Sequence, residues 1–221
     1  MTKHIQRQIE VLKQKILYVG TLVEEAIAKA VTALINRDAM LARKVMEADN
    51  VIDRMEVDVE EECLKIFALY QPVAADLRFV VAVLKINNDL ERMGDLAQNI
   101  AKRVVYVAKK DPIVDFNVDF RSMAANAQTM VKQSLDALVN SDTMLARQVR
   151  SEDDQVDHER QMIRDQIMDA IRKHPDRVEY LLKFNSIARH LERLADMATN
   201  VAEDVIYMVE GEIVRHQHLE D

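Results

Sequence analysis

Apolar residues recur along this chain at alternating steps of four and three, which is the spacing of helices that bury one face. One such stripe runs from Ile5 to Ala30, a second from Leu41 to Leu69 and a third from Phe79 to Val107. A period near 3.5 sustained over about 30 residues predicts helices of roughly 45 Å that wrap around one another as in a coiled coil. The first half of the chain is therefore predicted to form three long helices.

The second half of the sequence repeats the first. The segment ALINRDAMLAR at 33–43 matches ALVNSDTMLAR at 137–147 at an offset of 104, and LERMGD at 90–95 matches LERLAD at 191–196 at an offset of 101. A repeat of this length changes the expected fold from one large bundle to two related units.

The stretch at 109–112, Lys-Lys-Asp-Pro, is the natural joint between the halves, because proline cannot continue a helix and disfavours helical backbone at the residue before it. The sequence thus predicts an all-α protein of two tandem, sequence-related three-helix bundles with six long antiparallel helices. We expect the first bundle to span residues 1–110 and the second to span residues 111–221.

Local signals agree with the expected helix ends. Asp38 and Asp142 can each cap the helix that follows them, and Pro72 and Pro175 separate the second helix of each half from the third. Gly211 is a plausible terminator of the last helix.

The middle helix of the second half departs from the pattern, because Glu152 and Glu159 fall at positions that are apolar in the first half. We expect the buried face to drift along this helix, so that later apolar residues take over: Met162, Ile167 and Met168.

Composition narrows the possible functions. The chain has only 3 Gly and 3 Pro in 221 residues, and it contains no Gly-rich phosphate loop, dinucleotide fingerprint, nucleophile elbow or zinc-protease motif. A net charge of −8 argues against nucleic-acid binding. The chain has one cysteine, Cys63, and therefore cannot form an internal disulfide, which favours a cytoplasmic location. Cys63 is expected in the core. The apolar run from Phe79 to Leu84 is too short to insert into a membrane.

Pairs of acidic residues four apart are the most informative local feature, since residues at this spacing are neighbours on a helix and repel each other if nothing offsets them. Each half has two such pairs, and an asparagine extends the second pair by one turn. The candidate metal-binding residues are Asp49, Asp53, Glu91, Asp95 and Asn99 in the first half, and Asp153, Asp157, Glu192, Asp196 and Asn200 in the second.

An all-oxygen ligand set suits hard cations such as Mg²⁺, Ca²⁺, Mn²⁺ or iron, whereas zinc prefers histidine and cysteine. The competing interpretation is ordinary solvated surface charge, which Arg92 or Arg193 could neutralise. His158, His174 and His190 occur singly, without a partner at ligand spacing, and are expected on the surface.

Taken together, LERMGD at 90–95, LERLAD at 191–196 and Gln71-Pro72 with Asp76-Leu77-Arg78 closely resemble the PhoU family of phosphate-uptake regulators. The resemblance runs over nearly the whole chain. Ala195 departs from it, because the family often has the glycine seen at Gly94, and the Asp-Leu-Arg after Pro72 has no clear match after Pro175.

This resemblance implies two tandem three-helix bundles, a homodimer and metal ions at the acidic motifs, of which iron, manganese, magnesium or zinc are candidates. It also implies a non-enzymatic, negative regulatory role in phosphate homeostasis. The protein would act in the cytoplasm, peripheral to the membrane only through its partners, the ATPase subunit of the phosphate ABC transporter and a phosphate-sensing histidine kinase.

Two alternatives remain open from the residues. A ferritin-like carboxylate-bridged di-metal oxidoreductase is disfavoured because such sites use Glu-x-x-His pairs, which this sequence lacks. A metal-free helical scaffold would leave the acidic residues as plain surface charge.

Overall fold

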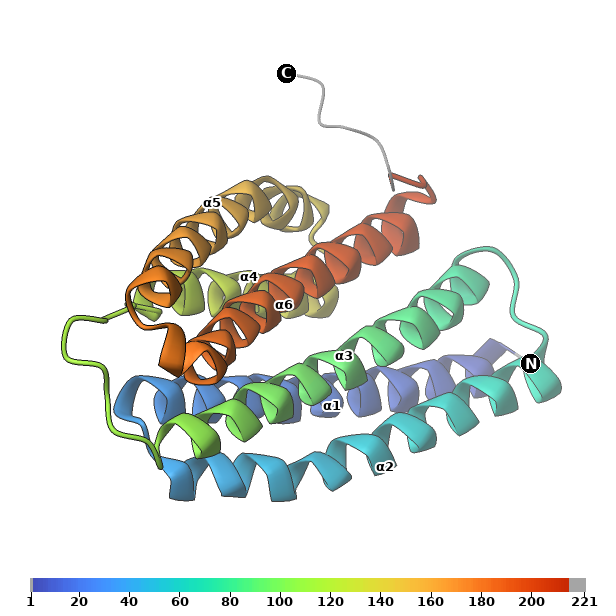
Figure 1. Ribbon diagram of the computed structural model, residues 1–221. Coiled ribbons are helices and arrows are strands. Elements are labelled where there is room, and N and C mark those ends of the chain that lie inside the picture. The colour runs from blue at the N-terminus through green and yellow to red at the C-terminus, as the bar shows by residue number, and fades with distance from the viewer. Residues whose placement is uncertain (1, 215–221) are drawn as a thin grey trace.

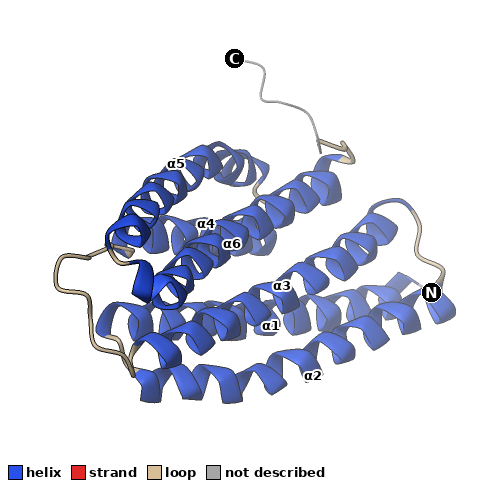
Figure 2. Cartoon of the chain, in the orientation of Figure 1, coloured by secondary structure: helices blue, strands red, loops and turns tan. Residues whose placement is uncertain are grey.

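The computed structural model describes residues 2–214, which form six α-helices and no strand (Figures 1 and 2). The predicted all-α fold is confirmed. The helices are α1 (Thr2–Asn36), α2 (Ala39–Tyr70), α3 (Ala74–Val107), α4 (Arg121–Asn140), α5 (Thr143–Lys173) and α6 (Val178–Glu210), with the short 3₁₀ turn η1 (Pro175–Arg177) before α6.

The helices form two three-helix bundles that pack against each other. Helices α1, α2 and α3 make the first bundle, and α4, α5 and α6 make the second. The bundles meet where α3 lies along α6 and α1 lies along α4, whereas α2 and α5 lie on opposite outer sides (Figure 1). The division of the chain at residue 110 stays a prediction.

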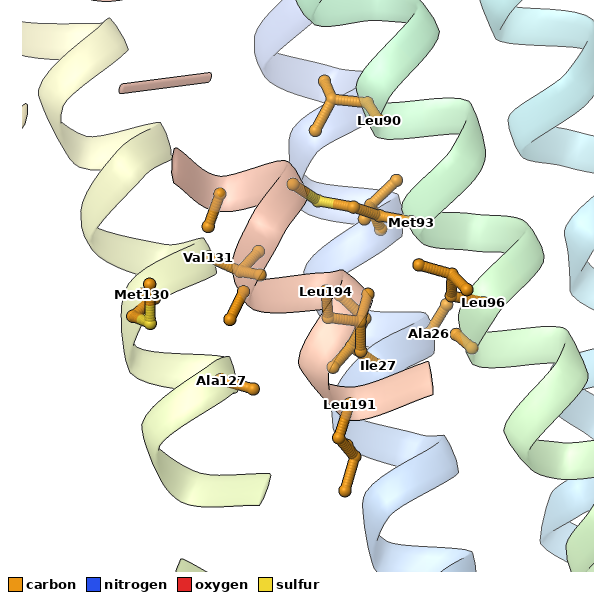
Figure 3. Packing of buried hydrophobic residues seen from close by; sticks show 14 of the residues in the cluster. Ala26, Ile27, Leu90, Met93, Leu96, Ala127, Met130, Val131, Leu191 and Leu194 are labelled. Carbon is orange, nitrogen blue, oxygen red and sulfur yellow. The ribbon is translucent and has the colours of Figure 1, made fainter. Parts of the chain in front are cut away.

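A single hydrophobic core runs through both bundles. Figure 3 shows residues of α3, α6, α4 and α1 converging on it. Fully buried members include Leu90 and Met93 from α3, Leu194 from α6 and Met130 from α4. Cys63 is also fully buried, as predicted. Because apolar burial drives folding, this shared core holds α3 and α6 in fixed register.

The corner between the first and second helices is built in the same way in both repeats. Arg37 and Ser141 adopt left-handed backbone with φ of 50° and 52°. The carboxylates of Asp38 and Asp142 then accept hydrogen bonds from two backbone N–H groups at the start of α2 and α5. The predicted caps are confirmed, and Gly211 ends α6 in left-handed backbone as expected.

The middle helix of the second bundle did not drift as predicted. Of the three residues expected to take over, Met162 and Met168 are 46% and 44% exposed, and Ile167 alone joins the core. Glu159 stays on the buried face, where its carboxylate accepts hydrogen bonds from Ser122 Oγ at 2.5 Å and Asn126 Nδ2 at 3.0 Å. These donors on α4 satisfy the buried carboxylate, so the helix keeps its register.

Helix α4 is shorter than its counterpart α1, with 20 residues against 35. The chain before it runs as a loop that contributes aromatic side chains to the end of the bundle. The ring of Phe184 on α6 contacts Phe116, Phe120 and Tyr180 at centroid distances of 5.1 to 6.2 Å.

Candidate functional site

The four acidic residues of the first repeat come together on the seam between α2 and α3. Asp49 and Asp53 lie one turn apart on α2, and Glu91 and Asp95 lie one turn apart on α3. Asp49 is buried at 7% exposure, Glu91 is half-buried, and Asp53 and Asp95 are exposed. We call these four residues the first acidic cluster.

Asp49 is the carboxylate of this cluster whose pKa is raised most. Burial, followed by the negative charges of Asp53 and Asp95, raises the pKa of Asp49 to about 6. Two groups on α3 oppose the rise: the charge of Lys102, and Gln98, whose Nε2 donates a hydrogen bond of 2.5 Å to Asp49 Oδ2. Sequence reasoning missed Gln98, because a single glutamine on a helix carries no distinguishing signal.

A fifth carboxylate extends the first cluster. The pKa of Glu91 is raised by burial and then by surrounding negative charges that include Asp95, Asp53 and Glu56. Glu56 lies on α2, three residues after Asp53, and its own pKa is raised by burial and by neighbouring carboxylates. The sequence analysis omitted Glu56, although its spacing from Asp53 places both on one helix face.

Gly94 allows α2 to approach α3 closely beside this cluster. A Cβ atom at Gly94 would lie 3.0 Å from Ile52 Cδ1 and 3.3 Å from Asp49 Oδ1. The absence of a side chain therefore positions Asp49 against α3. The equivalent residue in the second repeat is Ala195, which is buried.

The second repeat builds a matching cluster between α5 and α6. Asp153 and Asp157 lie on α5, and Glu192 and Asp196 lie on α6. Burial, followed by the charges of Asp153, Glu192 and Asp157, raises the pKa of Asp196 to about 6, although part of its side chain is exposed. Burial and then Asp157 also raise the pKa of Asp153, whereas Thr199 on α6 lowers it. These four carboxylates form the second acidic cluster.

The two clusters differ in the charges around them. Applying the repeat offset of 104 to Glu56 gives Arg160, which reverses the charge at that position. Arg160 Nε lies 3.3 Å from Glu192 Oε2, so this ion pair partly neutralises the second cluster. Arg193 also lowers the pKa of Asp196.

The two candidate asparagines make other contacts. Asn99 Oδ1 accepts a hydrogen bond of 3.0 Å from Arg103 Nη1. Asn200 lies beside Met197 and lines a groove between α3 and α6. Their role as ligands stays a prediction.

Of the single histidines, His158 is exposed as expected and His174 is half-buried. The expectation was wrong for His190, whose two ring nitrogens are buried without a hydrogen-bond partner in residues 2–214. Burial and nearby positive charges lower the pKa of His190 to about 4; those charges come from Arg103, Arg193 and Arg189.

Comparison with known proteins identifies the family. A family model described as the PhoU domain matches the chain twice, at residues 16–104 and 120–205. The chain is 40% identical over 216 residues to a phosphate-specific transport system accessory protein PhoU homolog of Aquifex aeolicus, covering 97% of each protein. The chain belongs to the PhoU family.

Solved structures of PhoU proteins share the fold. The crystal structure of PhoU from Pseudomonas aeruginosa matches with a TM-score of 0.90 at 35% identity, over 94% of this chain and 99% of that chain. The phosphate transport system regulatory protein PhoU from Streptococcus pneumoniae matches with a TM-score of 0.85 at 28% identity, over 95% and 99%. The resemblance noted in the sequence is therefore confirmed.

Each matched PhoU domain contains one acidic cluster, and the chemistry of both clusters fits a hard cation. Carboxylate oxygens are the ligands that such ions prefer, and burial followed by neighbouring negative charges raises the pKa of Asp49 and of Asp196. Within the described residues, no three acidic, histidine or cysteine side chains already converge as ligands of one ion. Binding would therefore require the carboxylates to turn toward a shared point.

None of the helices that the structure describes combines the length and apolar character needed to cross a bilayer.

Proposed function

We propose that this PhoU-family chain is a regulatory accessory protein of a phosphate-specific transport system and represses phosphate-starvation signalling when phosphate is plentiful. The observation that carries this proposal is the family match over both repeats, together with relatives that are named accessory proteins of that system and align over nearly their full length.

In this proposal the chain acts as an adaptor without catalysis of its own. Its partners are the ATPase subunit of the phosphate ABC transporter and a phosphate-sensing histidine kinase, and it works as a homodimer in the cytoplasm. The continuous core supports this role, because two bundles joined by buried helices present fixed surfaces to partners.

We further propose that the acidic clusters bind cations that stabilise the adaptor. In the first cluster Asp49, Asp53, Glu91 and Asp95 would hold the ion, and in the second Asp153, Asp157, Glu192 and Asp196 would do so. A bound cation would supply the positive charge that the buried carboxylates lack, and would thereby fix α2 against α3 and α5 against α6. Iron, manganese, magnesium and zinc are the candidate ions.

The regulatory proposal is tested by deleting the gene and measuring a phosphate-starvation reporter in phosphate-rich medium. We expect the reporter to be derepressed in the deletion strain and repressed again by a plasmid copy of the wild-type gene. An unchanged reporter in the deletion strain would refute the proposed function.

The adaptor contacts are tested with purified protein and separately purified ATPase subunit and kinase cytoplasmic domain, by sedimentation or interferometry. We expect saturable binding to each. If neither partner binds while deletion still derepresses the reporter, the regulatory role stands and the adaptor mechanism is wrong.

A further inference from the structure

Asp49 differs from the other members of the first acidic cluster because a hydrogen bond holds it in place. It is buried, whereas Asp53 and Asp95 are exposed. Gln98 Nε2 on α3 donates a hydrogen bond of 2.5 Å to Asp49 Oδ2, across the contact between α2 and α3. The exposed carboxylates can therefore turn toward an ion, whereas Asp49 is fixed against α3.

Lys102 fixes the direction in which the amide of Gln98 points. Lys102 Nζ, one turn further along α3, donates a hydrogen bond to Gln98 Oε1. An ammonium group can only donate hydrogen bonds, and an ionised carboxylate can only accept them. The amide oxygen of Gln98 must therefore face Lys102, and its NH₂ group must face Asp49. Every donor in this chain of three side chains meets an acceptor.

The hydrogen bond from Gln98 occupies only one oxygen of Asp49. Within residues 2–214, Asp49 Oδ1 takes part in no hydrogen bond or ion pair. This oxygen lies beside Gly94, 3.3 Å from the position that a Cβ atom would take there. One oxygen of Asp49 thus anchors the side chain, and the other is left for a ligand.

The second repeat lacks this chain of hydrogen bonds. The offset of 101 relates Gln98 to Thr199 and Lys102 to Glu203. Threonine has a shorter side chain without an amide group, and Glu203 Oε1 lies 3.3 Å from Arg150 Nε on α5. The arrangement of amide and ammonium groups is therefore specific to the first acidic cluster.

We propose that Gln98 is a positioning residue of the first cation site, whose amide holds Oδ2 of Asp49 against α3 so that Oδ1 is presented to the ion. Carboxylates that bind metals in proteins are themselves held by hydrogen bonds, and loss of such a partner typically lowers metal affinity by about 10–100-fold. Asp53 and Asp95 then need only turn toward an oxygen that is already in place, which reduces the entropy cost of binding.

This inference rests on the proposed binding of cations by the acidic clusters and adds a residue that tunes the affinity of one of them. The two proposals fail in different ways. If the folded wild type binds no cation, cation binding is itself wrong, and the inference falls with it. If the wild type binds a cation and Gln98 has no influence on the affinity, only the positioning role is wrong.

The test is titration of metal-free, full-length protein with Mn²⁺ at pH 8, with free Mn²⁺ counted by electron paramagnetic resonance. Binding at the first cluster is identified by its loss in Glu91→Gln with Asp95→Asn. The test variant is Gln98→Met, which keeps the length of the side chain and removes the amide. The matched control is Thr199→Val, at the equivalent position of the second repeat. The chosen pH lies well above the pKa of Asp49, which is about 6, so that protonation of this carboxylate contributes little.

We expect Gln98→Met to weaken Mn²⁺ binding at the first cluster by about tenfold or more, because Asp49 is no longer held. Thr199→Val should leave the affinity of the first cluster unchanged. Urea unfolding checks that both variants are folded. An affinity equal to that of the wild type in folded Gln98→Met, or an equal loss at the first cluster in Thr199→Val, would overturn the inference.

A second measurement, on cation-free protein, separates positioning from packing. Carboxyl-carbon NMR follows the ionisation of Asp49 as the pH is changed. Because the hydrogen bond from Gln98 lowers the pKa of Asp49, Gln98→Met should raise this pKa above that of the wild type. Loss of packing alone would not remove a hydrogen bond to the carboxylate. An unchanged pKa of Asp49 in Gln98→Met would therefore also overturn the inference.

Discussion

The two acidic clusters are built on the same backbone with the same four carboxylates, yet the residues around them differ. The first cluster has Glu56 where the second has Arg160, and it has Gly94 where the second has Ala195. The first therefore gains a fifth carboxylate and a close approach of Asp49 to α3, whereas the second contains an ion pair between Arg160 and Glu192.

The fold therefore determines where the carboxylates meet, whereas single neighbouring residues determine how much of their negative charge is neutralised. Arg160 and Arg193 already neutralise part of that charge at the second cluster. At the first cluster the charge of Lys102 lowers the pKa of Asp49, but the added carboxylate of Glu56 raises the pKa of Glu91. We therefore infer that the first cluster binds a cation more tightly than the second.

The largest expected effect comes from filling the space at Gly94. Gly94→Val should reduce the free energy of unfolding by about 2–3 kcal/mol, because the added atoms meet Ile52 and Asp49 on α2. Urea unfolding measures this. Gly94→Ala should have a smaller effect on the free energy of unfolding, because the helix propensity that alanine adds partly offsets the crowding of its Cβ atom. Full stability of the valine variant would show that the helices are not closely packed there.

The free energy of unfolding should depend on pH in a way that reflects the raised pKa of Asp49. Since its pKa is raised to about 6 in the folded protein, the folded state holds this proton more tightly than the unfolded chain does. The resulting stabilisation is present at acidic pH and is lost as the pH rises through about 6. His190 acts in the opposite direction, because its pKa is lowered.

Comparison with Asp49→Asn removes the contribution of other groups. In cation-free protein at pH 7.5 this variant should be more stable than the wild type by about 1–2 kcal/mol, and the advantage should disappear near pH 4. Urea unfolding across this range provides the measurement. A constant difference between the two proteins at all pH values would contradict a raised pKa at Asp49.

Exchanging the charges at positions 56 and 160 should make the two acidic clusters more alike. Glu56→Arg should stabilise the cation-free protein at neutral pH by about 0.5–1 kcal/mol, and Arg160→Glu should destabilise it by a similar amount, since both positions are partly exposed. Thermal unfolding in low salt, with repetition in high salt, measures both effects. Changes of the same sign in the two variants would remove charge as the cause of the difference.

The smallest effect should come from the asparagines. Asn99→Ala removes the side-chain acceptor for Arg103 and should change the free energy of unfolding of the cation-free protein by less than about 0.5 kcal/mol. Asn200→Ala is the matched variant in the second repeat. A large loss of cation affinity in either would make that asparagine a ligand.

Much of the fold could be predicted because its causes are local. Helix periodicity, the caps at Asp38 and Asp142, and the duplicated motif each lie in a short stretch of sequence. Glu159 could not be understood in this way, because the side chains that satisfy it come from α4. The burial of the His190 ring nitrogens likewise could not be predicted from the spacing of histidines along the chain.

The acidic residues could be found from their spacing, but the inequality of the two clusters could not. Glu56 and Arg160 look like ordinary charged residues on a helix surface until the structure places them beside Glu91 and Glu192. The net charge around each acidic cluster therefore depends on residues that the fold brings close to it, and the motif alone does not determine it.

The most direct measurement is titration of metal-free protein with Mn²⁺, with free Mn²⁺ counted by electron paramagnetic resonance. It should use the wild type, Glu91→Gln with Asp95→Asn, and Glu192→Gln with Asp196→Asn. We predict two classes of site in the wild type, loss of the tighter class in the first variant and loss of the weaker class in the second. No binding by the folded wild type, or loss of the tighter class in the second variant, would contradict cation binding ranked by cluster charge.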